Sequence, residues 1–178
     1  MISTLYRAQI EAAAEAEMLD ADLVEAIVII ESSGNRYAWN PEPRYRYVWN
    51  VRTHKPFRAL APSETLSKFP PSDFPTKAGD ADQEWWGQQA SWGLMQIMGA
   101  VARERGFVGP YLPELTEPEA NLFWGCAHLG RLLEWANGDI HKTLAAWNAG
   151  PGNWLSSVGQ SYANKVDRKL RELQQARL

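Results

Sequence analysis

Glu31 is the carboxylate whose position in the sequence best suits acid–base chemistry. On a helical wheel of about 100° per residue that starts at Leu23, Glu31 lies at about 80°, between Ile27 at about 40° and Val24 at about 100°. A carboxyl group among apolar side chains loses hydration, which disfavours the ionised form and raises its pKa. A carboxyl that stays protonated near neutral pH can act as a general acid. The alternative interpretation is a glutamate at a helix end that turns out to solvent.

The elements that must position Glu31 are helices near the start of the chain. Residues 3–18 are rich in Ala and Glu, which favour a helix. Asp20 or Asp22 offers an N-cap for a second helix that runs to about Ser33, and Gly34 is suited to end it.

Residues 36–92 differ in composition from the rest of the chain. They contain seven of the eleven prolines and five of the nine tryptophans, so long helices are disfavoured there. The aromatic and β-branched run at 44–51 predicts a short strand or hairpin arm. Long irregular segments inside compact domains often form lids or binding walls.

Helical signals return from Gly93 onward. We predict helices over 93–105, from a capping box of Thr116 and Glu119 to about 137–138, from Asp139 to near Gly150, and from Ser161 onward. The sequence therefore predicts a mainly α chain, one domain over 1–178, with an irregular insertion at about 36–92 that can contain a β-hairpin.

Composition narrows the class of protein. A chain of 178 residues with 45% hydrophobic residues is suited to one globular domain. A formal charge of −3 argues against a general nucleic-acid-binding role, and no nucleic-acid partner is expected. The single cysteine, Cys126, lies among apolar residues and is interpreted as a buried inert thiol. We find neither a signal peptide nor a membrane span, so synthesis in the cytoplasm is expected.

Four short blocks carry a more specific signal. They are Glu31-Ser32-Ser33-Gly34-Asn35, Ser91-Trp92-Gly93-Leu94-Met95-Gln96-Ile97-Met98, Ala146-Trp147-Asn148-Ala149-Gly150 and Tyr162-Ala163-Asn164-Lys165-Val166. In this order they resemble the signature of the soluble lytic transglycosylases, relatives of the goose-type lysozymes. Each block alone is weak, but all four in order are hard to obtain by chance.

The resemblance implies a lysozyme-like helical fold and a function. The substrate would be the β-1,4 bond from N-acetylmuramic acid to N-acetylglucosamine in peptidoglycan, with Glu31 as the single catalytic acid. The positions that match substrate-binding residues of the family are Ser32, Ser91, Met95, Gln96, Trp147, Asn148 and Tyr162. Gln96 and neighbouring backbone groups would hold the N-acetyl group, whereas Met95 is also interpreted as a core residue.

Two features depart from the family pattern. Trp147 stands where the family usually has tyrosine, so a hydrogen bond from a phenol must be absent or replaced. The segment between Gly34 and Ser91 is much longer than the usual connection. The compact length and lack of a leader are most similar to phage-encoded members, which would act on the cell wall in the periplasm after release or as a virion component.

The number of candidate carboxylates favours one mechanism over its alternatives. Glycoside hydrolysis usually needs two carboxyl groups, and only Glu31 has a motif context. Asp73, Asp80, Asp82 and Glu84 are interpreted as solvated loop charges. The muramic acid would then supply its own 6-hydroxyl and leave a 1,6-anhydro end. The alternatives are lysozyme-type hydrolysis of the same bond and a non-catalytic cell-wall-binding or virion module.

The remaining chemistry-bearing residues do not suggest a second site. His54, His128 and His141 lack the spacing of metal ligands, so no metal or cofactor is expected.

Peptidoglycan glycan strands are the expected partner, and we predict a monomer. Two interpretations of the aromatic-rich zone stay open, a mini-core that stabilises the long segment and a set of platforms for sugar rings; the residues are Trp39, Trp49, Trp85, Trp86 and Trp92.

Overall fold

The computed structural model describes residues 5–77 and 79–177. Over these ranges it contains seven α-helices, two short 3-10 helices and five short strands, which confirms the mainly α prediction. Contacts divide the chain into two compact units, and each is described by itself. The first unit comprises Met1–Gly34 and Gly125–Leu178, and the second comprises Asn35–Trp124.

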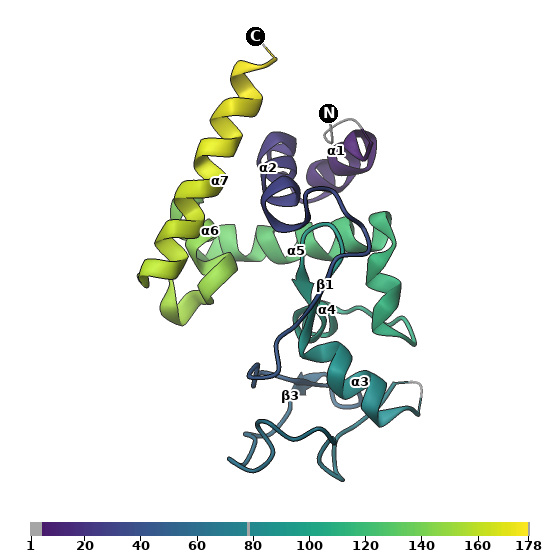
Figure 1. Cartoon of the computed structure of the whole chain (residues 1–178). Coiled ribbons are helices and arrows are strands. Elements are labelled where there is room, and N and C mark those ends of the chain that lie inside the picture. Colours follow the sequence, from purple (N-terminus) through teal and green to yellow (C-terminus); the bar gives the residue numbers. More distant parts are fainter. Residues whose placement is uncertain (1–4, 78, 178) are drawn as a thin grey trace. The chain divides into compact units, whose positions relative to one another are not determined.

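The first unit is built from helices. They are α1 (Arg7–Ala16), α2 (Ala21–Ser32), the part of α5 (Pro118–Trp135) that follows Trp124, α6 (Ile140–Ala149) and α7 (Ser157–Gln175). Helix α7 packs against both α6 and α2, and α1 packs against α2 (Figure 1). Each helix buries aliphatic residues, among them Ile10, Ile27, Leu129, Leu144 and Val166.

Side-chain caps explain where these helices start. Asp20 accepts a hydrogen bond from the Asp22 amide, and Asp139 accepts one from the Lys142 amide, so both predicted N-caps are confirmed. Helix α7 begins at Ser157 rather than Ser161. The Ser156 hydroxyl accepts from the Gly159 amide there, which starts the helix one turn before the predicted residue.

The predicted capping box at Thr116 is wrong. Thr116 ends a 3-10 helix (Leu112–Thr116), and its hydroxyl donates to the Pro113 carbonyl instead of accepting from a backbone amide of α5. Helix α5 begins at Pro118, because proline has a φ suited to a first helical turn and no amide that needs a partner.

Cys126 is fully buried on α5, as predicted. Burial, followed by the nearby negative charge of Glu17, raises the pKa of its thiol to about 12, so the group stays protonated. None of the helices in the described ranges is long and apolar enough to cross a membrane.

The second unit contains two small antiparallel sheets. Strands β1 (Trp39–Pro41), β4 (Ala90–Trp92) and β5 (Ile97–Met98) form one sheet in the order β1-β4-β5. Strands β2 (Trp49–Asn50) and β3 (Lys55–Pro56) pair as a hairpin, which confirms a hairpin within the 36–92 segment. Helices α3 (Ala81–Gln88) and α4 (Gly99–Arg105) complete the unit.

The helix predicted over 93–105 is shorter than expected. Its first residues form a tight turn and strand β5, because Gly93 and Gln96 both adopt left-handed backbone conformations with φ of 68° and 50°. Helix α4 then starts at Gly99 and ends at Gly106, the predicted stop. A side chain at position 93 would also clash, because a Cβ there would lie 2.3 Å from Asn121 Nδ2.

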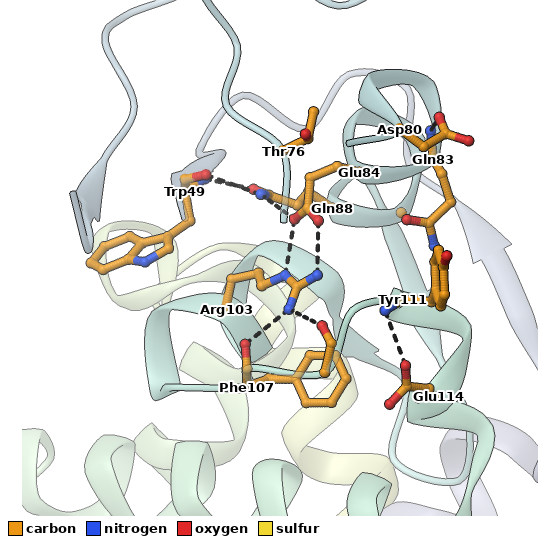
Figure 2. A network of polar contacts seen from close by, with 12 residues as sticks. Trp49, Thr76, Asp80, Gln83, Glu84, Gln88, Arg103, Phe107, Tyr111 and Glu114 are labelled. Carbon is orange, nitrogen blue, oxygen red and sulfur yellow. Dashed lines mark hydrogen bonds and ion pairs between the residues drawn. The ribbon is translucent and has the colours of Figure 1, made fainter. Parts of the chain in front are cut away.

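A buried ion pair joins α3 to α4 within the second unit. Arg103 and Glu84 have side chains only 1% exposed, with Nη2 and Oε2 2.7 Å apart. Figure 2 shows the Arg103 guanidinium directed at the Glu84 carboxylate on one side and at backbone carbonyls, including that of Phe107, on the other. The interpretation of Glu84 as a solvated loop charge is therefore wrong.

Candidate active site

Glu31 lies in the last turn of α2, where the helix is about to end. Ser33 follows in the left-handed conformation with φ of 53°, and its amide donates to the Ile29 carbonyl. The preceding turns of α2 are buried, whereas Glu31 is half-buried. The helix thus fixes the backbone of Glu31 at the edge of the apolar interior of the first unit.

Two side chains from other helices hold the Glu31 carboxyl group. The Tyr162 hydroxyl on α7 donates to Glu31 Oε1 over 2.6 Å, and Trp147 Nε1 on α6 donates to the same oxygen over 3.1 Å. Tyr162 and Trp147 lie 131 and 116 residues from Glu31 in the sequence, and the packing of these helices brings them to its carboxyl group. Glu31 therefore does not turn out to solvent, which was the alternative interpretation.

The surroundings of Glu31 favour its protonated form. Burial raises the pKa of this carboxyl, while the hydrogen bonds from Tyr162 and Trp147 act in the opposite direction. Burial also raises the pKa of the Tyr162 phenol well above its usual value, and the adjacent Glu31 raises it further. The pair therefore combines a carboxyl whose protonated form is favoured with a phenol that keeps its proton at neutral pH.

Trp147 makes a hydrogen bond of its own at the position where the family usually has tyrosine. Its indole N–H donates to Glu31, so this departure places a polar contact on the carboxyl group. The ring of His128 on α5 lies against the indole, with ring centroids 5.4 Å apart. This contact could not be predicted from the sequence, because His128 lies outside the four blocks.

Ser32 and Asn148 are also in the first unit. The Ser32 hydroxyl donates to the Val28 carbonyl over 3.1 Å and accepts from the Gly34 amide over 3.2 Å, so it helps to shape the end of α2. Asn148 follows Trp147 on α6 and is exposed. An exposed amide next to the acid-binding indole is suited to contact a polar substrate.

Gln96 and Ser91 lie together in the second unit. Gln96 Nε2 donates to the carbonyls of Ala38 and Gly93, and its Oε1 accepts from the Ser91 hydroxyl over 3.0 Å. Both ends of the Gln96 amide therefore have protein partners. The side chain braces the start of β1 against the turn between β4 and β5, so a sugar contact through Nε2 would need one of its two bonds to be exchanged.

Met95 is a core residue, because it is fully buried. Its amide donates to Asn121 Oδ1 over 2.8 Å, and Asn121 Nδ2 in turn donates to the carbonyls of Trp92 and Leu115. Asn121 thereby fixes the turn that contains the second motif block. We did not identify it from the sequence, since a single asparagine on a helix has no distinguishing pattern.

The aromatic residues of the second unit divide into buried and exposed sets. Trp85 is fully buried against Phe74, with Val48 in the same cluster, so it belongs to a mini-core. Trp92 is also buried, with its indole N–H donated to the Gly87 carbonyl. Trp39 and Trp86 are 53% and 37% exposed, whereas Trp49 is partly buried, so among the five tryptophans of this segment Trp39 and Trp86 present the most open faces for a sugar ring.

The other acidic residues of the long segment have local roles. Asp73 is exposed and pairs with Arg58, and Asp80 caps α3 by accepting from the Gln83 amide. Asp82 is exposed in the first turn of α3. Asp73, Asp80 and Glu84 are therefore engaged in structural contacts within this unit.

No group of three His, Cys, Asp or Glu side chains within 5–77 and 79–177 is arranged to hold a metal ion. His141, one of the three histidines, instead joins two helices. Its Nδ1 lies 2.9 Å from Asp167 Oδ2 and its Nε2 lies 3.1 Å from Gln160 Oε1, both on α7.

Comparison with known proteins gives a consistent family and fold. The family model described as the transglycosylase SLT domain matches residues 8–169. A crystal structure of an inactive mutant of the lytic transglycosylase Slt from Pseudomonas aeruginosa is similar, with a TM-score of 0.61 and 18% sequence identity. The match covers 95% of this chain and 24% of that chain, so the present chain spans about a quarter of its length. The predicted lysozyme-like helical fold is confirmed.

Proposed function

The chain belongs to the transglycosylase SLT domain family, and from this premise we propose that it is a peptidoglycan lytic transglycosylase with Glu31 as its acid. The substrate bond is the β-1,4 link from N-acetylmuramic acid to N-acetylglucosamine. The observation that carries this proposal is the partly buried Glu31 carboxyl, which is held by Tyr162 and Trp147 and has a raised pKa.

The proposed reaction uses Glu31 twice. The protonated carboxyl first donates its proton to the glycosidic oxygen as the bond to the muramic acid anomeric carbon breaks. The N-acetyl oxygen of the same sugar can stabilise that carbon. Glu31 then accepts the proton of the 6-hydroxyl while the hydroxyl oxygen attacks the anomeric carbon. A nucleophile tethered to the reacting ring has a large effective concentration, so water is not needed.

We expect digestion of purified peptidoglycan to release muropeptides that end in 1,6-anhydro-muramic acid. These products are lighter by one water than hydrolysis products and have no end that borohydride can reduce. Mass spectrometry with and without borohydride measures both properties. Mostly reducing ends would indicate lysozyme-type hydrolysis, and no released product would favour a non-catalytic cell-wall-binding or virion module.

Substrate contacts are proposed for residues that present polar atoms or rings. Ser32 and Asn148 are the candidates beside Glu31 in the first unit. In the second unit we propose Ser91 and Gln96 as substrate contacts. They would act by exchanging their present hydrogen bonds or through the neighbouring backbone. Met95 is not included among the side-chain contacts, because it is fully buried.

We expect Trp39→Ala and Trp86→Ala to weaken glycan binding more than they lower thermal stability. Both rings are substantially exposed, and an aromatic contact contributes roughly 0.5–1.5 kcal/mol, or about 2- to 10-fold in affinity. Binding of an N-acetylglucosamine hexamer to the Glu31→Gln protein measures the effect. Trp135→Ala is the matched control, because Trp135 is 40% exposed on α5 in the first unit. Equal affinities for all three variants would contradict a stacking role.

The predicted setting of the enzyme is the cell wall, with peptidoglycan glycan strands as partner. Three predictions remain untested. They are that a phage encodes the protein, that it acts after release or as a virion component, and that it is a monomer. An assay of lysis on permeabilised cells, with added protein, tests access to the wall directly.

A further inference from the structure

Both hydrogen bonds to the Glu31 carboxyl reach the same oxygen. Tyr162 and Trp147 donate to Oε1, over 2.6 Å and 3.1 Å respectively. An indole N–H can only donate, so Oε1 must be the acceptor in its contact with Trp147. With two donors directed at it, Oε1 is suited to be the carbonyl oxygen of the protonated acid rather than the oxygen that bears the proton.

We propose that Trp147 and Tyr162 hold the proton of Glu31 on Oε2 and stabilise the negative charge on Oε1 when that proton leaves. This inference rests on the proposed function and deepens it. Trp147 is then a positioning residue that acts through Glu31, and not the sugar contact that its motif position implies. A tyrosine hydroxyl at this position could accept a hydrogen bond as well as donate one, whereas the tryptophan N–H can only donate.

The proton balance of the reaction supports this role. The Oε2–H bond breaks as an O–H bond forms at the glycosidic oxygen, and its electron pair remains on the carboxylate. The charge is shared by both oxygens, and hydrogen bonds to an ionised acceptor are stronger than those to a neutral one. Oε2 takes the proton of the 6-hydroxyl in the second half, so Glu31 ends as it began.

The fold holds both donors in place before the reaction. Trp147 is backed by the His128 ring, and Tyr162 is buried. His141 joins α6, which carries Trp147, to α7, which carries Tyr162, through contacts with Gln160 and Asp167. Fixed donors directed at a developing charge are an effective form of electrostatic catalysis, because they need no reorganisation during the reaction.

The test compares Trp147→Phe and Tyr162→Phe with the wild type, and Trp135→Phe is the control for exchanging a tryptophan. On sonicated peptidoglycan we expect each of the first two to lower kcat roughly 10- to 100-fold with KM nearly unchanged, since each removes a hydrogen bond to a charged group. Tyr162→Phe removes only a hydroxyl, which keeps the test valid if Trp147→Phe folds poorly. A raised KM with unchanged kcat would overturn the proposal and make Trp147 a sugar contact.

The pH profile gives a second measurement. Because both donors favour ionised Glu31, their loss should move the fall in kcat at high pH to still higher pH. The packed helices carry further titratable groups, among them Tyr162 itself, His128 on α5 and the His141–Asp167 pair between α6 and α7. Wild type and Trp147→Phe share all of them, so a shift between the two profiles reports on Glu31. Coincident profiles would overturn the proposal.

Infrared spectroscopy of the unliganded protein tests the proton position without relying on activity. The Glu31 band is assigned by its absence in Glu31→Gln. Loss of one hydrogen bond to the carbonyl oxygen should raise the C=O stretching frequency of protonated Glu31 in Trp147→Phe and in Tyr162→Phe. An unchanged frequency would overturn the assignment of the proton to Oε2. If both variants showed this shift but the wild-type protein had no lytic activity, only the proposed function would be contradicted, and the proton position would stand.

Discussion

Replacing Glu31 with glutamine is expected to abolish peptidoglycan cleavage while the protein remains folded. The amide has nearly the shape of the carboxyl, and its oxygen can still accept from Tyr162 and Trp147. An amide NH2 group stands in place of Oε2 and is not acidic enough to transfer a proton, and loss of a positioned general acid typically costs ~10²–10⁴ in rate. Turbidity of a peptidoglycan suspension and mass spectrometry of the soluble products measure the loss.

The stability of the Glu31→Gln variant provides a check on folding. Because burial raises the pKa of Glu31 in the folded state, the wild type loses stability as pH rises from the unfolded value toward the folded one. Glutamine does not titrate, so the melting temperature of the variant should equal or exceed that of the wild type at neutral pH. A clearly lower melting temperature would mean that the carboxylate stabilises the fold.

Glu134→Gln is the matched control for the activity measurement. Glu134 lies on α5 with a side chain 76% exposed and has only a surface contact to Arg131. The same chemical change there should leave cleavage unchanged. If Glu31→Gln retained activity close to that of this control, Glu31 would not be the acid of the reaction.

The sequence predicted the helical unit well because its determinants are local. Asp20 and Asp139 cap helices by bonding to amides two or three residues away, and Gly106 ends α4 where a left-handed residue is needed. The wheel position of Glu31 placed it among apolar residues, and the structure shows that carboxyl partly buried. The contacts from Tyr162 and Trp147 come from distant helices, and only the motif blocks suggested that these residues belong together.

The second unit was harder to predict because its determinants are not local. The role of Asn121 depends on three backbone groups that come from other segments of the chain. Gln96 was expected to bind a sugar, yet its amide braces β1, which is distant in sequence. A hydrophobic pattern reports which face is buried, but it does not show which polar groups will meet inside.

Glu84 is the clearest example, and its pairing with Arg103 leads to a stability prediction. Glu84 Oε1 accepts from Arg103 Nε and from Gln88, and Oε2 accepts from Arg103 Nη2 (Figure 2). Arg103 Nη1 donates to the carbonyls of Phe107 and Gly109. All of these groups belong to the second unit, so the ion pair ties α3, α4 and the following loop together.

We expect Arg103→Met to lower the free energy of unfolding by about 3–5 kcal/mol, because it leaves the Glu84 charge buried without its partner. Glu84→Gln should also be strongly destabilising, since it leaves the guanidinium buried without a counter-charge. The double variant should lose less than the sum of the two single losses, because no isolated charge remains. Urea unfolding of all three variants measures these differences.

Arg58→Met is the control, because Arg58 is 42% exposed and pairs with Glu64 and Asp73 at the surface. An exposed ion pair is screened by water and salt, so this change should shift the unfolding midpoint far less than Arg103→Met. Similar shifts of the unfolding midpoint for both arginine variants would mean that burial does not increase the contribution of the Glu84–Arg103 pair to stability. Strictly additive losses in the double variant would likewise contradict direct coupling between Glu84 and Arg103, and the order of α3 and α4 would then depend mainly on the surrounding apolar contacts.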